Sequence, residues 1–182
     1  QNLPSFLNSQ IDSLKIEGRM KGHLYAATVT KSYAECINEW RAHGIISKSA
    51  LDKSNGELQK MSHRDYTNAS LINPAGTDSI FDERENTSDE YVTVGVVVES
   101  IKDKYILVEI KKSFERGEEL ELLMFQGNNK KLDISTIFNL DESDAIEKTR
   151  PGSLVKIPCR ENIEPFTLCR RKIASSVREI NE

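Results

Sequence analysis

The spacing of apolar residues in the first half of the chain predicts helices. Between residues 20 and 43 the apolar positions recur every three or four residues, which places one apolar stripe along an amphipathic helix. Gly44 follows at a position where a left-handed residue commonly ends a helix, so the helix is expected to stop there. The side chains that form the stripe are Tyr25, Val29, Tyr33, Ile37 and Trp40.

Shorter elements are expected on either side of this helix. Residues 11–17 alternate apolar and polar side chains over their second half, a period of two that predicts a short strand. Further along, Ser49 and Asp52 have the spacing of a capping box and predict a second helix that Ser49 caps. The Asn55–Gly56 pair is expected to interrupt that helix.

The second half of the chain has a β pattern. Short runs rich in β-branched and aromatic residues alternate with turn signals, which predicts strands. Six such runs predict a small closed antiparallel barrel, because closure removes the exposed strand edges. With the helices before it, the chain belongs to the α+β class. The expected strands are residues 91–100, 104–112, 119–125, 131–140, 153–159 and 166–172.

Charge patterning divides the chain further. Residues 77–90 contain six carboxylates and one arginine, and we expect an exposed acidic linker there. We therefore predict a helical region over residues 1–76, this linker, and a β-barrel domain over residues 91–182.

Composition excludes several classes of protein. The 182 residues have a net charge of −4, which is not the charge of a strongly basic nucleic-acid binder. There is no run of about 18 apolar residues and no signal peptide, so we expect no membrane span and a cytoplasmic protein. The three cysteines include no close pair, which favours a reducing compartment, and they are too far apart for a metal cluster.

The end of the predicted first strand contains a group of charged residues. Lys15 and Glu17 would share one face of the strand and could pair, and Arg19 follows the Gly18 break next to the helix. A solvated strand face explains this pattern. The alternative is a strand that ends at a ligand site, as in β/α barrels, with Arg19 placed to hold an anion.

A second group lies in "SHRDYT", residues 62–67. His63 could act as a general acid or base, and Arg64 could hold a carboxylate or phosphate through two hydrogen bonds. Adjacent residues of an extended chain point in opposite directions, so His63 and Arg64 are not expected to serve one site, whereas Tyr66 could share the face of Arg64. A purely structural role for this segment is the alternative. No HExxH or GxSxG motif accompanies it.

These segments resemble a known family. "SLKIEGRMK" (residues 13–21), followed by "YAATVTKSY" and then "ELQKMSHRDYT" (residues 57–67), resembles the collagenase-like peptidase family of unknown catalytic type, the PrtC type. In that family a β/α barrel precedes a small C-terminal β-barrel similar to the second domain of elongation factor Tu. "RPGSLVKI" (residues 150–157) is similar to a turn of that domain. The chain departs from the family at residues 68–71, where a Gly-Phe pair is expected.

The resemblance implies that residues 1–76 are the end of a catalytic barrel. A complete β/α barrel needs about 250 residues, so we expect the chain to be a fragment whose main partner is a missing N-terminal barrel. By this resemblance Glu17, Arg19 and His63 are candidate catalytic residues, and Lys15, Arg64 and Tyr66 are candidate substrate-binding residues. Some relatives hold an iron–sulfur cluster with cysteines of the missing part. We expect such a cluster in the parent protein, and no metal or cofactor in this chain.

Three functions remain open. The resemblance favours a fragment of a peptidase, a hydrolase, inactive alone, whose β-barrel is an accessory domain that positions a peptide. Some relatives hydroxylate a tRNA or ribosomal RNA base, so an RNA-binding accessory part is the second hypothesis. A structural module or homodimer contact is the third. For RNA, the only local basic cluster in the sequence contains Lys156, Arg160, Arg170, Arg171 and Lys172.

Overall fold

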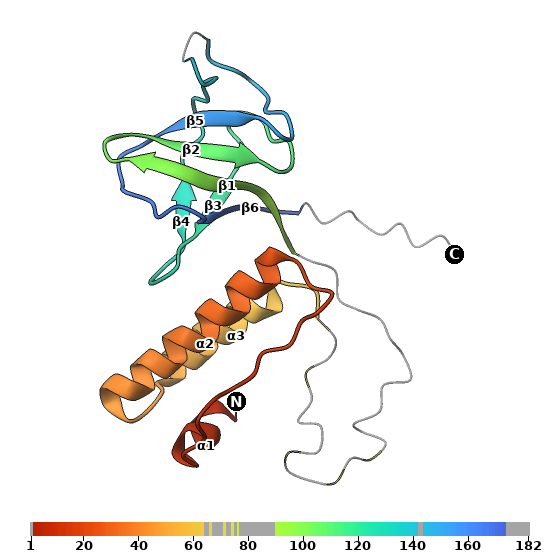
Figure 1. The fold of residues 1–182 in the computed structure, drawn as a ribbon, viewed down its shortest axis with the longest axis vertical. Helices are drawn as coiled ribbons and strands as arrows, with labels where there is room; N and C mark the ends of the chain where they lie inside the picture. Colours follow the sequence, from red (N-terminus) through yellow and green to blue (C-terminus); the bar gives the residue numbers. More distant parts are fainter. Residues whose placement is uncertain are drawn as a thin grey trace.

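The computed structural model describes residues 2–63, 66, 71, 74, 76, 90–141 and 144–173. A helical part precedes a β-sheet part, and the paired helices α2 and α3 lie beside one end of the sheet (Figure 1). The helices are α1 (Leu3–Asn8), α2 (His23–His43) and α3 (Lys48–Gln59). The strands are β1 (Tyr91–Ile101), β2 (Lys104–Ile110), β3 (Leu120–Leu123), β4 (Lys130–Leu132), β5 (Leu154–Cys159) and β6 (Leu168–Lys172).

The six strands form one antiparallel sheet in the order β4-β3-β6-β1-β2-β5, which confirms the predicted fold class. The sheet curls around an apolar core to which β1, β2, β3, β5 and β6 all contribute buried side chains. Within the described residues β4 and β5 do not pair with each other. Instead Phe138, beyond β4, exchanges two backbone hydrogen bonds of 2.9 Å with Lys156 of β5. The sheet is therefore a half-barrel whose open side is bridged by an irregular segment.

Several predicted boundaries were wrong. Residues 11–17 form no strand, because no other described segment pairs with their backbone. The N-cap of α3 is Ser47, whose hydroxyl accepts a 3.1 Å hydrogen bond from the Ala50 amide, and not Ser49. The helix also continues through Asn55–Gly56, and α1 was not expected. The predicted end of α2 is confirmed: Gly44 is left-handed, with φ of 72°. The expected linker lies, except for Glu90, outside the described residues.

The buried face of α2 differs from the predicted stripe. Val29 is buried as expected, but Tyr33 is exposed, and the buried positions include Lys31, Ser32 and Cys36. Lys31 donates a 2.6 Å hydrogen bond to the Asn129 side chain, in the turn between β3 and β4. The buried face of α2 makes polar contacts, so the spacing of apolar residues alone could not identify it correctly. Among the described residues, no helix combines the length and the apolar run that a membrane span requires.

A buried arginine joins the helices to the sheet. Arg170 of β6 is completely buried, and its Nη2 lies 2.8 Å from Glu57 of α3 and 2.5 Å from Glu121 of β3. Its Nε also donates to Glu121, at 2.6 Å. The guanidinium stands 4.5 Å from the ring centre of Tyr91, at the start of β1, and Lys60 stands over the same ring at 5.3 Å. We call these five residues the Arg170 network.

The network determines the charge of its central carboxylate. Burial disfavours ionisation of Glu57, but the hydrogen bond from Lys60 and the charge of Arg170 outweigh it, so the pKa of Glu57 lies below its ordinary value. Lys60 also accepts, through its carbonyl oxygen, a 3.0 Å hydrogen bond from the Glu90 amide. The end of α3 and the beginning of β1 are thereby held next to each other.

Candidate functional site

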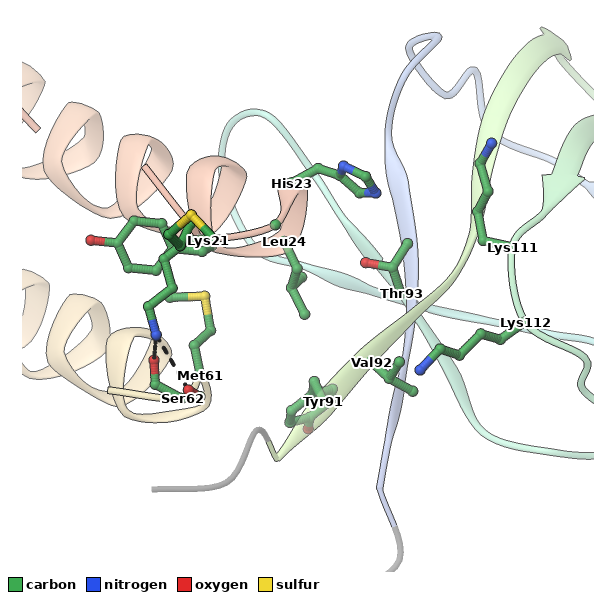
Figure 2. Close-up of a pocket in the computed structure, with 13 residues that line it drawn as sticks. Lys21, His23, Leu24, Met61, Ser62, Tyr91, Val92, Thr93, Lys111 and Lys112 are labelled. Carbon is green, nitrogen blue, oxygen red and sulfur yellow. Dashed lines mark hydrogen bonds between the residues drawn. The ribbon is translucent and has the colours of Figure 1, made fainter. Parts of the chain in front are cut away.

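A pocket of about 460 Å³ lies where the start of α2, the end of α3 and the first residues of β1 meet. Figure 2 shows its walls: His23 extends from the start of α2 toward β1, and Lys112, which follows β2, reaches back past Val92 toward the helices. Its basic side chains are Lys21, His23, Lys111 and Lys112, and none of the described residues that line it is acidic. In a chain of net charge −4, this local excess of positive charge favours an anionic ligand.

The start of α2 adds partial positive charge to this wall. Gly22 is the N-cap, with φ of −78° and ψ of 177°, and no side chain caps the helix. The first turn contains no acidic residue, and the first backbone hydrogen bond of the helix closes at the Ala26 amide. The amides of residues 23–25 are therefore available to an external acceptor, as at many anion-binding helix ends.

The two sequence motifs meet at this pocket. The Lys21 ammonium, from "SLKIEGRMK", donates a 2.8 Å hydrogen bond to the Ser62 carbonyl oxygen and lies 3.3 Å from its hydroxyl, in "SHRDYT". Tyr25 donates from its hydroxyl to the Glu17 carbonyl oxygen at 3.3 Å. The ring packs directly over Gly18, because a Cβ at this position would clash with the ring unless the ring moved.

The first group of predicted site residues is brought together, but in solvent. The Glu17 carboxylate lies 3.4 Å from Lys15 and 3.6 Å from Arg19, so the expected pairing of Lys15 with Glu17 is present. The Lys15 and Arg19 side chains are 84% and 88% exposed, and that of Glu17 is 58% exposed. None of the three lines the pocket, and their catalytic or binding roles stay predictions.

The second group is only partly described. His63 and Tyr66 stack with ring centres 4.5 Å apart and planes 17° from parallel, and the Tyr66 hydroxyl donates to the Leu58 carbonyl oxygen at 3.2 Å. Burial, with smaller contributions from Tyr25 and Tyr33, raises the pKa of Tyr66. Tyr66 thus faces His63. Arg64 lies outside the described residues.

Sequence reasoning missed the pocket itself. Lys21 and Ser62 lie within the quoted motifs, so a search for polar contacts between the motifs could have found them. Lys111 and Lys112 are the last two residues of a predicted strand and have no distinguishing pattern. The basic cluster noted in the sequence is only partly exposed: Arg170 is buried, and Arg171 lies 2.5 Å from Glu118. Arg160 and Lys172 are exposed.

The described residues offer little for metal or thiol chemistry. Among them there is no group of three or more His, Cys, Asp or Glu side chains that could hold a metal ion. Cys36 is buried and lies 3.2 Å from the Ser54 hydroxyl. Burial raises the pKa of Cys169 to about 12, and it also raises that of Cys159. These thiols are thus poor candidates for a nucleophile.

Comparison with known families identifies both parts of the chain. The profile of peptidase family U32 matches residues 1–80, and the profile of the peptidase family U32 C-terminal domain matches residues 89–170. The chain belongs to peptidase family U32. The family resemblance of the sequence motifs is thereby confirmed for the helical part and for the sheet part.

Two curated relatives of this U32 chain have names that refer to RNA. The chain is 29% identical over 176 residues to tRNA hydroxylation protein P1 of Bacillus subtilis. The aligned region covers 94% of this chain and 40% of that protein. It is 31% identical over 119 residues to tRNA hydroxylation protein P of Escherichia coli, covering 65% and 25% respectively. The chain thus spans less than half the length of either relative.

A solved structure also matches the U32 chain. It is the C-terminal domain of a Geobacillus thermoleovorans protein described as a U32 peptidase, with 21% identity and a TM-score of 0.40. The match covers 45% of this chain and 92% of that domain.

Proposed function

We propose that this chain is the C-terminal part of a U32 protein that modifies tRNA, and that its pocket and sheet hold the RNA while another part performs the reaction. The observation that supports this function best is the pocket lining, with three lysines, one histidine and no carboxylate. A phosphate backbone supplies the complementary charge, whereas a peptide has no regular charge that would require such a lining. The names of the two curated relatives agree with this choice.

The peptidase function has less support from the described residues. A hydrolase that uses a covalent mechanism needs an activated nucleophile within reach of a base. Cys36 and Cys169 are buried, and the pKa values of Cys159 and Cys169 are raised rather than lowered. In this proposal Lys15, Glu17 and Arg19, which are exposed here, lie at the edge of a catalytic site. The remainder of the parent protein supplies the rest of that site. The parent protein then has a catalytic β/α barrel, and residues 1–76 are the end of it. Residues 77–90 are a linker, and residues 91–182 are the C-terminal domain.

A salt-dependent binding assay with matched charge variants tests the proposal. Fluorescence anisotropy of labelled, unmodified tRNA is measured against the whole 182-residue chain between about 50 and 200 mM salt. The test variant is Lys111→Ala/Lys112→Ala, at the pocket end of β2. The control is Lys102→Ala/Lys104→Ala, at the other end of the same strand, which changes the net charge equally.

We expect the pocket variant to bind tRNA at least about tenfold more weakly. The plot of log K against log salt should also become less steep by about 1.4, which is about 0.7 for each of the two lost phosphate contacts. The control should bind within about twofold of the unaltered chain. Equal losses in both variants, or tRNA binding no tighter than binding of a gelatin peptide, would refute the proposal.

A further inference from the structure

Several donors that have no partner of their own line the pocket. The residues at the start of α2, whose amides are free, line it, and so do His23, beside Thr93, and Lys112, beside Val92 (Figure 2). Neither the His23 side chain nor the Lys112 ammonium has a hydrogen bond or ion pair with another described residue. Lys111, by contrast, lies 2.5 Å from Glu109, and Lys21 is bonded to Ser62.

A buried hydroxyl adds a further unused donor. Thr93 of β1 lines the same pocket, and its Oγ1 is buried without a hydrogen-bond partner among the described residues. In Figure 2 this oxygen lies on the side of β1 that faces the start of α2. An unpaired buried hydroxyl is costly, and an acceptor brought into the pocket would satisfy it after a small side-chain movement.

We propose that this pocket contains a phosphate site, which holds one backbone phosphate of the RNA at the start of α2 beside His23, with Lys112 reaching it from the segment after β2. The inference rests on the proposed function and makes it more specific, because it assigns one phosphate to one helix end. A phosphate oxygen accepts from the amides of residues 23–25, and Lys112 supplies the opposing charge. Thr93 lines the same pocket.

Gly22 allows the helix end to be blocked without harming the fold. Its φ is negative, and a Cβ at this position would meet no atom within 4 Å. Asp and Asn are both favoured N-cap residues that accept a hydrogen bond from the first-turn amides. Gly22→Asp would therefore cap α2 and place a negative charge where the phosphate is proposed to bind. Gly22→Asn would cap it without that charge.

A further variant controls for nonspecific repulsion. Ala42→Asp adds the same charge near the opposite end of α2, roughly 30 Å away along the helix at 1.5 Å per residue. The whole chain and the three variants are compared in tRNA anisotropy, in competition of inorganic phosphate against tRNA, and in thermal unfolding.

We expect Gly22→Asp to bind tRNA at least about tenfold more weakly, to lose competition by inorganic phosphate, and to unfold at the same or a higher temperature. Gly22→Asn, whose side chain competes for the same amides without adding a charge, should weaken binding less than Gly22→Asp, and Ala42→Asp should stay within about threefold of the unaltered chain. If Gly22 had only a structural role, its replacement would not weaken tRNA binding without also lowering the unfolding temperature.

The other outcomes separate the two proposals. If Gly22→Asp binds tRNA as tightly as Gly22→Asn, the phosphate site is wrong, whereas the Lys111→Ala/Lys112→Ala result still decides the proposed function. If the unaltered chain binds inorganic phosphate in a manner that Gly22→Asp abolishes, but does not bind tRNA, the proposed function fails and the RNA phosphate is excluded as the ligand. If it binds neither, both proposals fail.

Discussion

Replacement of Arg170 should reveal how strongly the helices and the sheet depend on each other. Arg170→Met removes the charge and keeps most of the side-chain volume, so the main effect is electrostatic. Removal of one partner of a fully buried ion pair costs about 3–5 kcal/mol, because the other charge is left buried. Here Glu57 and Glu121 are 15% and 25% exposed, and Glu57 keeps Lys60 as a partner. We therefore expect a loss of about 2–3 kcal/mol.

The neighbouring residue provides a matched control. Arg171 pairs with Glu118, and these side chains are 31% and 30% exposed. Pairs that are this accessible to water contribute about 1 kcal/mol or less, so Arg171→Met should have a small effect. Combining Arg170→Met with Glu57→Gln and Glu121→Gln should recover most of the loss, because no charge is then buried alone.

Urea unfolding at neutral pH measures these differences with two probes. Trp40 is the only tryptophan of the chain and lies in α2, so its fluorescence follows the helical part, while circular dichroism follows both parts. If the network couples the parts, both transitions of Arg170→Met shift to lower urea. An effect of Arg170→Met no larger than that of Arg171→Met would refute the reasoning.

Acid should weaken the same coupling. The pKa of Glu57 is lower in the folded chain than in the unfolded one, so its ionised form stabilises the fold above the unfolded pKa. That stability is lost as the pH falls from about 5 through the folded value. Arg170→Met removes one cause of the lowered pKa, and its free energy of unfolding should therefore depend less on pH in this range.

Three further predictions concern local structure. Gly95→Ala should destabilise the sheet by about 1–3 kcal/mol in urea unfolding, because its Cβ would lie 2.6 Å from a buried valine methyl group; a neutral result would mean that the core is loose there. Ser47→Ala should cost about 1 kcal/mol through the lost helix cap, whereas Ser49→Ala should cost less than half as much, and equal costs would contradict the observed cap. With iodoacetamide at pH 8, mass spectrometry should find Cys159 alkylated well before Cys169, which is buried and has a pKa of about 12; equal rates would contradict that burial.

The sheet was predictable because its signals are local. The β1–β2 hairpin combines two β-branched runs with a turn at residues 102–103, and the structure pairs Ile101 with Tyr105 across it. Residues 11–17 show the limit of the same signal. Alternation indicates which side chains share a face, but a strand also requires a partner, and no described segment supplies one.

The site was less predictable because its contacts are distant in sequence. Arg170 belongs to a run of basic residues that resembles an exposed cluster. It is buried because Glu57 and Glu121, 113 and 49 residues away in the chain, both reach it. Lys112 is an ordinary lysine after a strand until the start of α2 is brought opposite it. Sequence motifs located Lys21 and Ser62, but only the fold shows that they border a pocket with Lys112.

The Arg170 network and the pocket share a structural element, and this connects stability to binding. Tyr91 lines the pocket and is also covered by Arg170 and Lys60, while Met61 and Ser62, next to Lys60, form the facing wall. The network therefore holds two walls of the pocket at a fixed separation, although Arg170 itself does not line it. Arg170→Met should accordingly weaken tRNA binding in the absence of urea, where the variant is still folded, and Arg171→Met should not. If Arg170→Met loses stability but binds tRNA normally, other contacts set the geometry of the pocket, and the buried ion pairs serve the fold alone.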